Sequence, residues 1–168
     1  MSEQPSGGNE PRIVVGVDGS ASSEQALRWA LRQAELTGAT VEAIIAWHFH
    51  FISSSYVVML TDVVASSTEF QKIAERVLAD TVSRVTAGGF PAPVTQRVLE
   101  GEAAAVLIRE SAGADLLVVG SRGHGGLAEA LLGSVGQHCV HHAACPVVVV
   151  RGDVTTAGST TDSKEASS

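Results

Sequence analysis

The sequence predicts an α/β fold, a single-domain doubly wound five-stranded parallel sheet with helices on both faces. Five apolar runs of strand length alternate with segments whose apolar residues recur at helical spacing, an order typical of such sheets. Several runs are apolar at every position, as in strands that are buried on both faces. The chain has 168 residues, 45% of them hydrophobic, which suits one domain with one core.

The five expected strands are short segments bounded by polar residues or glycine. They are Ile13 to Val17, Val41 to Trp47, Val94 to Leu99, Leu116 to Val119 and Val147 to Val150. Parallel strands need crossover connections, which are almost always right-handed, so the intervening helices are expected on both faces of the sheet.

The first two helices have recognisable ends. One is expected to begin near Ser22, whose hydroxyl can cap it while Gln25 reaches back, and to stop at Gly38. The next has an apolar stripe of period near 3.6 from Phe70 to Val85 and stops at Gly88.

The last two helical patterns are shorter. One runs from Glu102 to about Ala112. The other begins near Gly133 or Ser134, carries Val135, Cys139 and Ala143 on its inner side, and ends before Pro146 opens the last strand. Residues 48–67 have no regular pattern, and the sequence does not define their conformation.

Composition excludes several classes of protein. Eleven basic residues against 18 acidic ones give a net charge of −7, which does not favour nucleic acid as a partner. No apolar run reaches the ~18 residues of a membrane span, and residues 1–11 do not resemble a targeting segment. Two cysteines, Cys139 and Cys145, fit a reducing compartment, so we expect a cytoplasmic protein that does not bind membranes.

Two glycine-containing segments follow strands at the positions where α/β sheets bind ligands. Gly16 to Ser20 follows the first strand, and Gly120 to Gly126 follows the fourth before the chain enters the helix at Gly133. Glycines let backbone N–H groups approach an anion, and a helix N-terminus attracts it. Ser134 can add a hydroxyl donor, and Asp18 suits a ribose hydroxyl.

The spacing of these residues matches a known signature. Two residues separate Gly120 from Gly123, and nine more separate Gly123 from the pair Gly133-Ser134. The pattern resembles the GxxG, nine residues, G(S/T) signature of ATP-binding universal stress proteins.

The resemblance extends over most of the chain. Val17 to Ser20 is similar to the family's opening, and Leu131 to Arg151 is similar to its closing helix and strand. We therefore expect a universal stress protein domain at 12–151, between tails at 1–11 and 152–168 that are rich in small and polar residues and are expected to be disordered.

The resemblance implies strand order 3-2-1-4-5, an adenine nucleotide alpha hydrolase-like fold, and a pocket between the first and fourth strands. Asp18 would meet the ribose or adenine, and the backbone at Ala46 and Trp47 would border the base. Arg122 and His124 would lie in the loop that covers the phosphates. The implied nucleotide-binding residues are Gly16, Val17, Asp18, Ala46, Val119, Gly120, Arg122, Gly123, His124, Gly133, Ser134 and Val135.

The resemblance also implies a function: binding of ATP with Mg²⁺ by a regulator of stress adaptation that signals to an unknown protein partner. A homodimer is expected through the last strand, Val147, Val148, Val149 and Val150, because that order places it at a sheet edge. Alternatives are a slow ATPase with the same pocket, a sensor of AMP or cyclic AMP, and, more remotely, a flavoprotein.

Catalytic and metal sites are less well supported by the sequence. No GxxxxGK[ST] motif is present, and no GxSxG surrounds Ser121 or Ser134, so a phosphoryl-transfer lysine or a serine nucleophile with His124 as base is not expected. His138, His141 and His142 share helical spacing, but no acid or second cysteine completes a zinc set.

Overall fold

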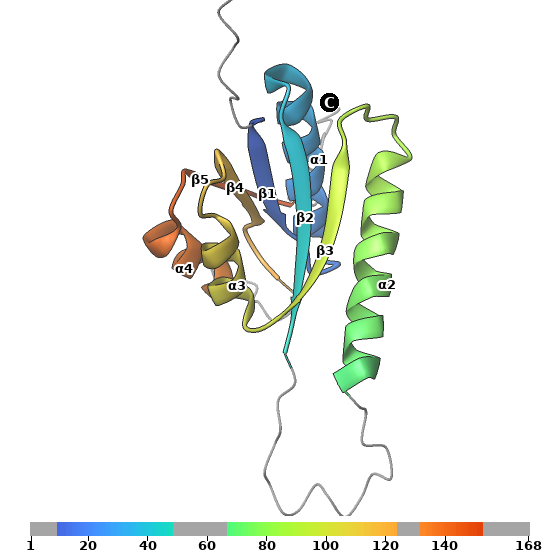
Figure 1. The fold of residues 1–168 in the computed structure, drawn as a ribbon, viewed down its shortest axis with the longest axis vertical. Coiled ribbons are helices and arrows are strands. Elements are labelled where there is room, and N and C mark those ends of the chain that lie inside the picture. Colours follow the sequence, from blue (N-terminus) through green and yellow to red (C-terminus); the bar gives the residue numbers. More distant parts are fainter. Residues whose placement is uncertain (1–9, 49–66, 124–131, 153–168) are drawn as a thin grey trace, which may run out of the picture.

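The computed structural model describes residues 10–48, 67–123 and 132–152. Five parallel strands form one sheet in the order β3-β2-β1-β4-β5 (Figure 1), which confirms the expected fold class and strand order. The elements are β1 (Arg12–Gly16), α1 (Ala21–Thr37), β2 (Thr40–Trp47), α2 (Ser67–Thr86), β3 (Val94–Glu100), α3 (Ala103–Glu110), β4 (Leu116–Gly120), α4 (Ser134–His142) and β5 (Val147–Val150).

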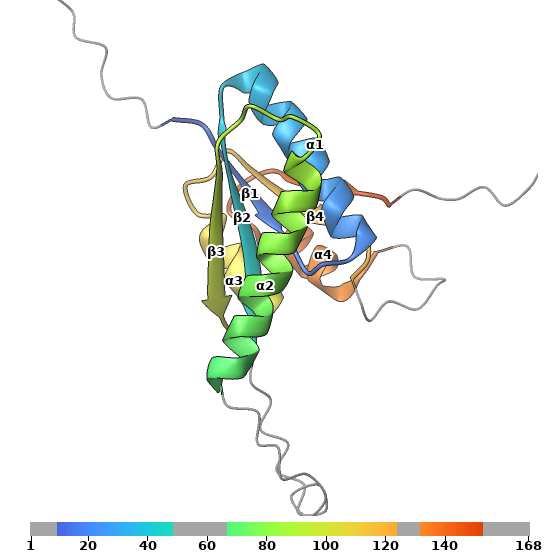
Figure 2. The ribbon, with the colours of Figure 1, turned by 90° about the vertical axis from the view of Figure 1, so that its right-hand side faces the viewer.

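The helices form two layers, one on each face of the sheet (Figure 2). The larger apolar cluster lies under α1 and α2 and includes Val15, Leu27 and Leu78, all at most 1% exposed. The smaller cluster lies under α3 and α4 and includes Ile44 and Leu107. Alternate residues of one strand face opposite layers, which explains why the strands are apolar at successive positions.

The N-terminus of α1 differs from the expectation. Ser20, not Ser22, is the N-cap, and its Oγ accepts a hydrogen bond from the backbone N–H of Ser23 at 3.2 Å. Asp18 Oδ1 accepts bonds from both the backbone N–H and the hydroxyl of Ser20, at 2.9 and 2.5 Å, and so orients that cap. Ser22 is buried instead, with its hydroxyl 3.3 Å from the carbonyl of Val150.

The other helix ends lie close to their expected places. Gly38 ends α1 in the left-handed region at φ 69°, as a glycine cap does. The helix α3 ends at Glu110 rather than near Ala112, and α4 begins at Ser134 with Gly133 as N-cap. The irregular segment after His48 and both expected tails lie almost wholly outside the described residues.

The sheet order places the ends of β1 and β4 side by side. β2, the next strand in the chain, pairs with one edge of β1, whereas β4 pairs with the other edge of β1. Loops that leave a sheet at such a reversal of strand order diverge and leave a space for a ligand. In the described ranges, no helix has both the length and the apolar character that crossing a membrane requires.

Candidate functional site

A cavity of about 310 Å³ lies at the carboxyl ends of β1 and β4. It brings together every described residue of the expected set: Gly16, Val17, Asp18, Ala46, Val119, Gly120, Arg122, Gly123, Gly133, Ser134 and Val135. His124 lies outside the described residues. Trp47 is not among the described lining residues and packs with the core under α1 and α2, because it alternates with Ala46 along β2.

Five further residues line the cavity that sequence reasoning did not identify: Ser23, Ile44, Ala103, Leu107 and Gly136. Three of them come from the first turns of α1, α3 and α4, where no motif distinguishes an inward residue. The apolar pattern of α3 was the available signal, because Leu107 lies one turn beyond Ala103 and therefore on the same side of the helix.

The apolar wall of the cavity depends on a close approach of α3 to β1. A Cβ atom added to Gly16 would lie 2.7 Å from Leu107 Cδ1 and 3.5 Å from Val119 Cγ1. Leu107 is 4% exposed and Val119 is 3% exposed, so this wall is well packed. Glycine at position 16 therefore lets Leu107 lie directly against the strand, and a larger residue there would displace the end of the Leu107 side chain.

Asp18 lies both in a turn and at the cavity. Its Oδ1 holds the Ser20 cap of α1, whereas its Oδ2 faces the loop after β4. A Cβ atom added to Gly123 would lie 2.7 Å from that Oδ2, so Gly123 leaves room for the carboxylate. Gly123 does not adopt a positive φ angle. The requirement for glycine here is therefore one of space.

Ser121, at the start of the loop after β4, is held by backbone contacts on two sides. The backbone N–H of Ser121 donates to the carbonyl of Val150 at 2.7 Å. The backbone carbonyl of Ser121 accepts a hydrogen bond from the N–H of Gly133 at 2.8 Å. A Cβ atom at Gly120 would lie 2.8 Å from the backbone carbonyl carbon of Ser22. The start of the loop therefore packs tightly against α1.

The N-terminus of α4 opens into the cavity without a side-chain cap. Its N-cap, Gly133, offers no side-chain acceptor, and the first helical bond runs from Gln137 to the Gly133 carbonyl at 3.0 Å. The N–H groups of residues 134–136 precede that bond and have no partner within the helix. Such donors, with the positive end of the helix dipole, attract an anion.

Charge in the cavity is sparse and of both signs. Of the described lining residues only Asp18 and Arg122 are ionisable as acid or base, and neither histidine nor cysteine occurs among them. The cavity is therefore suited to a ligand with an apolar part, a hydroxyl-bearing part and an anionic part, held mainly by backbone donors.

The expected histidines lie along the middle and the C-terminal end of α4. The rings of His138 and His142 have centroids 6.3 Å apart, and those of His141 and His142 are 6.2 Å apart. Within the described ranges no three His, Cys, Asp or Glu side chains are arranged to hold a metal ion.

Comparison with known proteins assigns the family. The model of the Universal stress protein family matches residues 11–151. The chain belongs to the universal stress protein family. A universal stress protein of Mycobacterium tuberculosis is 37% identical over 139 residues, which are 83% of this chain and 45% of that protein. The chain spans about half the length of the curated relatives it matches.

Solved structures of universal stress proteins have the same fold. A crystal structure of a universal stress protein in complex with cAMP is 25% identical and has a TM-score of 0.62. The match covers 86% of this chain and 98% of that one. An Arabidopsis thaliana family member with AMP bound is 20% identical with a TM-score of 0.57, over 89% of this chain and 97% of that one. The second likeness bears on the fold alone.

Proposed function

We propose that this universal stress protein binds an adenine nucleotide in the cavity and acts as a nucleotide-responsive regulator rather than as an enzyme. The observation that carries the proposal is the convergence on one cavity of the uncapped N-terminus of α4, the Asp18 carboxylate and the apolar wall at Leu107. The complex of a 25% identical universal stress protein with cAMP supports it.

Each part of a nucleotide has a counterpart in the cavity. The phosphates would lie at the N–H groups of Ser134 and its neighbours, with the Ser134 hydroxyl as a further donor. The Oδ2 of Asp18, for which the described residues show no hydrogen bond, would accept a ribose hydroxyl. The base would lie against Ile44 and Leu107. The volume, about 310 Å³, is at the lower end of the ~300–1,000 Å³ of small-molecule sites.

ATP is the proposed ligand because of the spaced glycine signature ending at Ser134, and Mg²⁺ would accompany it. Asp18 is the only carboxylate among the described lining residues, and one of its oxygens is already bonded to Ser20. Mg²⁺ usually keeps several waters and is held by one or two carboxylates plus phosphate oxygens. The residues present therefore fit an ion that arrives with the phosphates.

The domain bounds, the assembly and the cellular location are also proposals. We propose the universal stress protein domain at 12–151, which the family match to residues 11–151 supports. A homodimer through the edge strand β5 and a separate protein partner would transmit the nucleotide state. The unpaired thiols Cys139 and Cys145 fit a cytoplasmic location.

Asp18 gives the sharpest test of the nucleotide geometry. Asp18→Ala should weaken ATP binding by about 1–3 kcal/mol, the scale of a lost charged hydrogen bond, and Ser134→Ala should cost less because the N–H groups remain. Calorimetric titration measures both. Asp18→Asn is the matched control, since it retains an acceptor for the Ser20 cap. Equal affinity in wild type and Asp18→Ala would contradict the assignment.

A sensor of AMP or cyclic AMP is the second candidate, and the cAMP complex of the similar protein favours it. Native mass spectrometry of freshly purified protein would identify the bound nucleotide and its stoichiometry, and competition among ATP, AMP and cyclic AMP would rank them. Phosphate release from ATP over hours would distinguish a slow ATPase. A protein that takes up no adenine nucleotide at millimolar concentration would refute the proposed function.

A further inference from the structure

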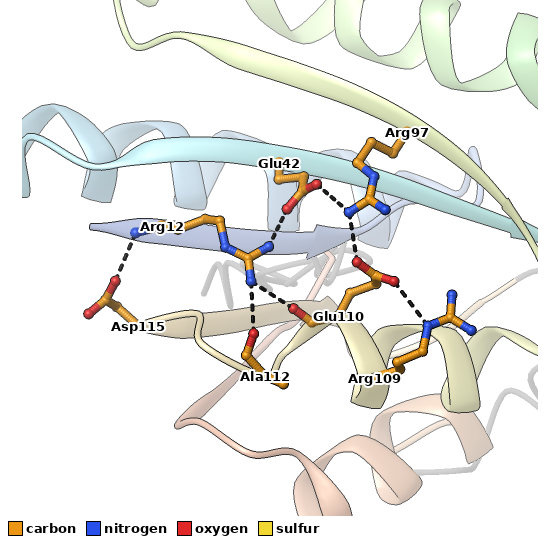
Figure 3. Close-up of polar contacts among 7 residues, drawn as sticks. All are labelled: Arg12, Glu42, Arg97, Arg109, Glu110, Ala112 and Asp115. Atoms are coloured by element: carbon orange, nitrogen blue, oxygen red, sulfur yellow. Dashed lines mark hydrogen bonds and ion pairs between the residues drawn. The ribbon is translucent and has the colours of Figure 1, made fainter. Parts of the chain in front are cut away.

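A network of ion pairs occupies the part of the sheet that α3 does not cover. The helix has eight residues, or ~12 Å, whereas β2 has eight residues and spans ~26 Å. The carboxyl half of this sheet face forms the cavity and its apolar wall. The amino half carries Arg12 on β1, Glu42 on β2 and Arg97 on β3, and Figure 3 shows their side chains directed toward the end of α3.

The network links three strands to the last residue of α3. Glu42 lies between two arginines: Arg12 pairs with its Oε2, and Arg97 Nη1 lies 2.7 Å from its Oε1. The same Arg97 nitrogen lies 2.7 Å from Glu110 Oε2. A continuous chain of opposite charges therefore runs from β1 through β2 and β3 to the helix.

Arg12 also binds the backbone at this end of the helix. Its Nη2 donates to the carbonyls of Glu110 and Ala112, both at 3.0 Å, and its backbone N–H donates to Asp115 Oδ2 at 2.8 Å (Figure 3). Carbonyls at a helix C-terminus lack partners and carry partial negative charge, so a guanidinium stabilises them.

These contacts are partly shielded from water on the side of the acids. The side chains of Glu42 and Glu110 are 12% and 15% exposed, and those of Arg12 and Arg97 are 26% and 37% exposed. Ion pairs shielded from water are screened less by salt, and removing one partner leaves the other unpaired. Arg109 differs: its side chain is 61% exposed, and it pairs with Glu110 from within the same helix.

The first five residues of α3, from Ala103 to Leu107, border the cavity. Ala103 and Leu107 line it, and Leu107 lies against Gly16. A helix of two turns is a short rigid body, so the position of its C-terminus determines the position of Leu107. The network and the cavity wall thus share one short helix, with Leu107 three residues before Glu110.

We propose that Arg12 and Arg97 are positioning residues of the cavity: by fixing Glu110 and the end of α3 on the sheet, they set the place of Leu107 and hence the affinity for the ligand. Neither arginine lines the cavity. The ligand arm of the test below rests on the proposed function, whereas the ligand-free arm does not.

The ligand-free arm compares Arg97→Gln with Arg109→Gln in the full chain. Both remove one arginine from Glu110, but only Arg97 joins the helix to the sheet. We expect faster amide hydrogen exchange across Ala103–Glu110 and a shifted Leu107 methyl signal in Arg97→Gln, with neither change in Arg109→Gln. Identical exchange and methyl signals in the two variants would overturn the inference. Glu110→Gln, a milder change, replaces Arg97→Gln if that variant fails to fold, with the same expectation.

The ligand arm measures ATP affinity in the same variants. Arg97→Gln should weaken ATP binding about 2- to 30-fold, the range of couplings through packed elements, while Arg109→Gln should match wild type. Arg97→Lys should recover part of the loss because it restores the charge. Unchanged affinity in Arg97→Gln would overturn the role in binding. If wild type binds no adenine nucleotide, the proposed function fails and the ligand-free arm alone decides the inference.

Discussion

Gly16 shows how a single residue defines the cavity. A methyl group there would lie 2.7 Å from Leu107 Cδ1, and Val119 borders the same space. If a methyl group were added, the flexible end of the Leu107 side chain would have to move, because the backbone of β1 is hydrogen-bonded to a strand on each side. The presence of glycine at this strand end is therefore explained by the approach of α3.

Gly16→Ala should displace the Leu107 side chain and weaken ATP binding, at a cost of about 1–3 kcal/mol in stability, the usual range for overpacking. Gly38→Ala is the matched control. Gly38 has φ 69°, and no described atom lies within 4 Å of an added Cβ, so alanine there costs about 1–2 kcal/mol in stability without touching the cavity. Denaturant unfolding and calorimetric titration test both variants. Loss of affinity proportional to loss of stability in the two variants would contradict this role of Gly16.

At the scale of elements, the C-terminus of α3 depends on the protonation of Glu110. Burial would raise the pKa of this carboxyl, but hydrogen bonds from Arg97 and Arg109 together outweigh burial and hold the pKa below its ordinary value. A group whose pKa is lowered by folding stabilises the fold when pH lies above its unfolded value of about 4.3. That contribution disappears as pH falls through the lower, folded pKa.

Glu110→Gln should therefore be less stable than wild type near pH 7, and the difference should shrink as pH falls below about 4. Urea unfolding of both proteins at pH 7 and at pH 3.5 measures the difference. A gap in stability that stays constant across this range would show that Glu110 acts through packing rather than through its charge.

The elements differ in how far the sequence predicted them. The strands were predicted within one residue at each end, because most of them are short apolar runs bounded by polar residues or glycine. The start of α1 was wrong by two residues. Three serines, Ser20, Ser22 and Ser23, offer equivalent caps in sequence, and only the bond from Ser20 to Asp18 selects the first.

The part of the cavity formed by the glycine-containing loops was predicted from the sequence. The part formed by the face of α3 was not. The glycine spacing identified the loop after β4, whereas Leu107 could be assigned only once α3 was placed on β1. The arginine network was not predicted either. Arg12 and Glu110 are 98 residues apart in sequence, and no local pattern pairs them.

At the scale of the whole molecule, β5 is an edge strand of the sheet. Its four valines are half-buried, and beyond β4 no described strand pairs with it. An unpaired, apolar edge favours pairing with a second copy, which a two-fold axis closes into a dimer. Light scattering at micromolar concentration should give twice the chain mass, and Val148→Pro should reduce it. A monomeric wild-type mass would contradict the proposed dimer.

An ATP titration followed by amide NMR is the most direct test of nucleotide binding at the junction of β1, β4 and α4. Addition of ATP to the wild-type protein should shift the amide signals of Ser134, Val135 and Gly136 in a saturable manner, because these N–H groups would bind the phosphates. Signals of the outer face of α2 should remain in place. No shift at millimolar ATP, or shifts confined to residues away from the cavity, would contradict nucleotide binding at this site.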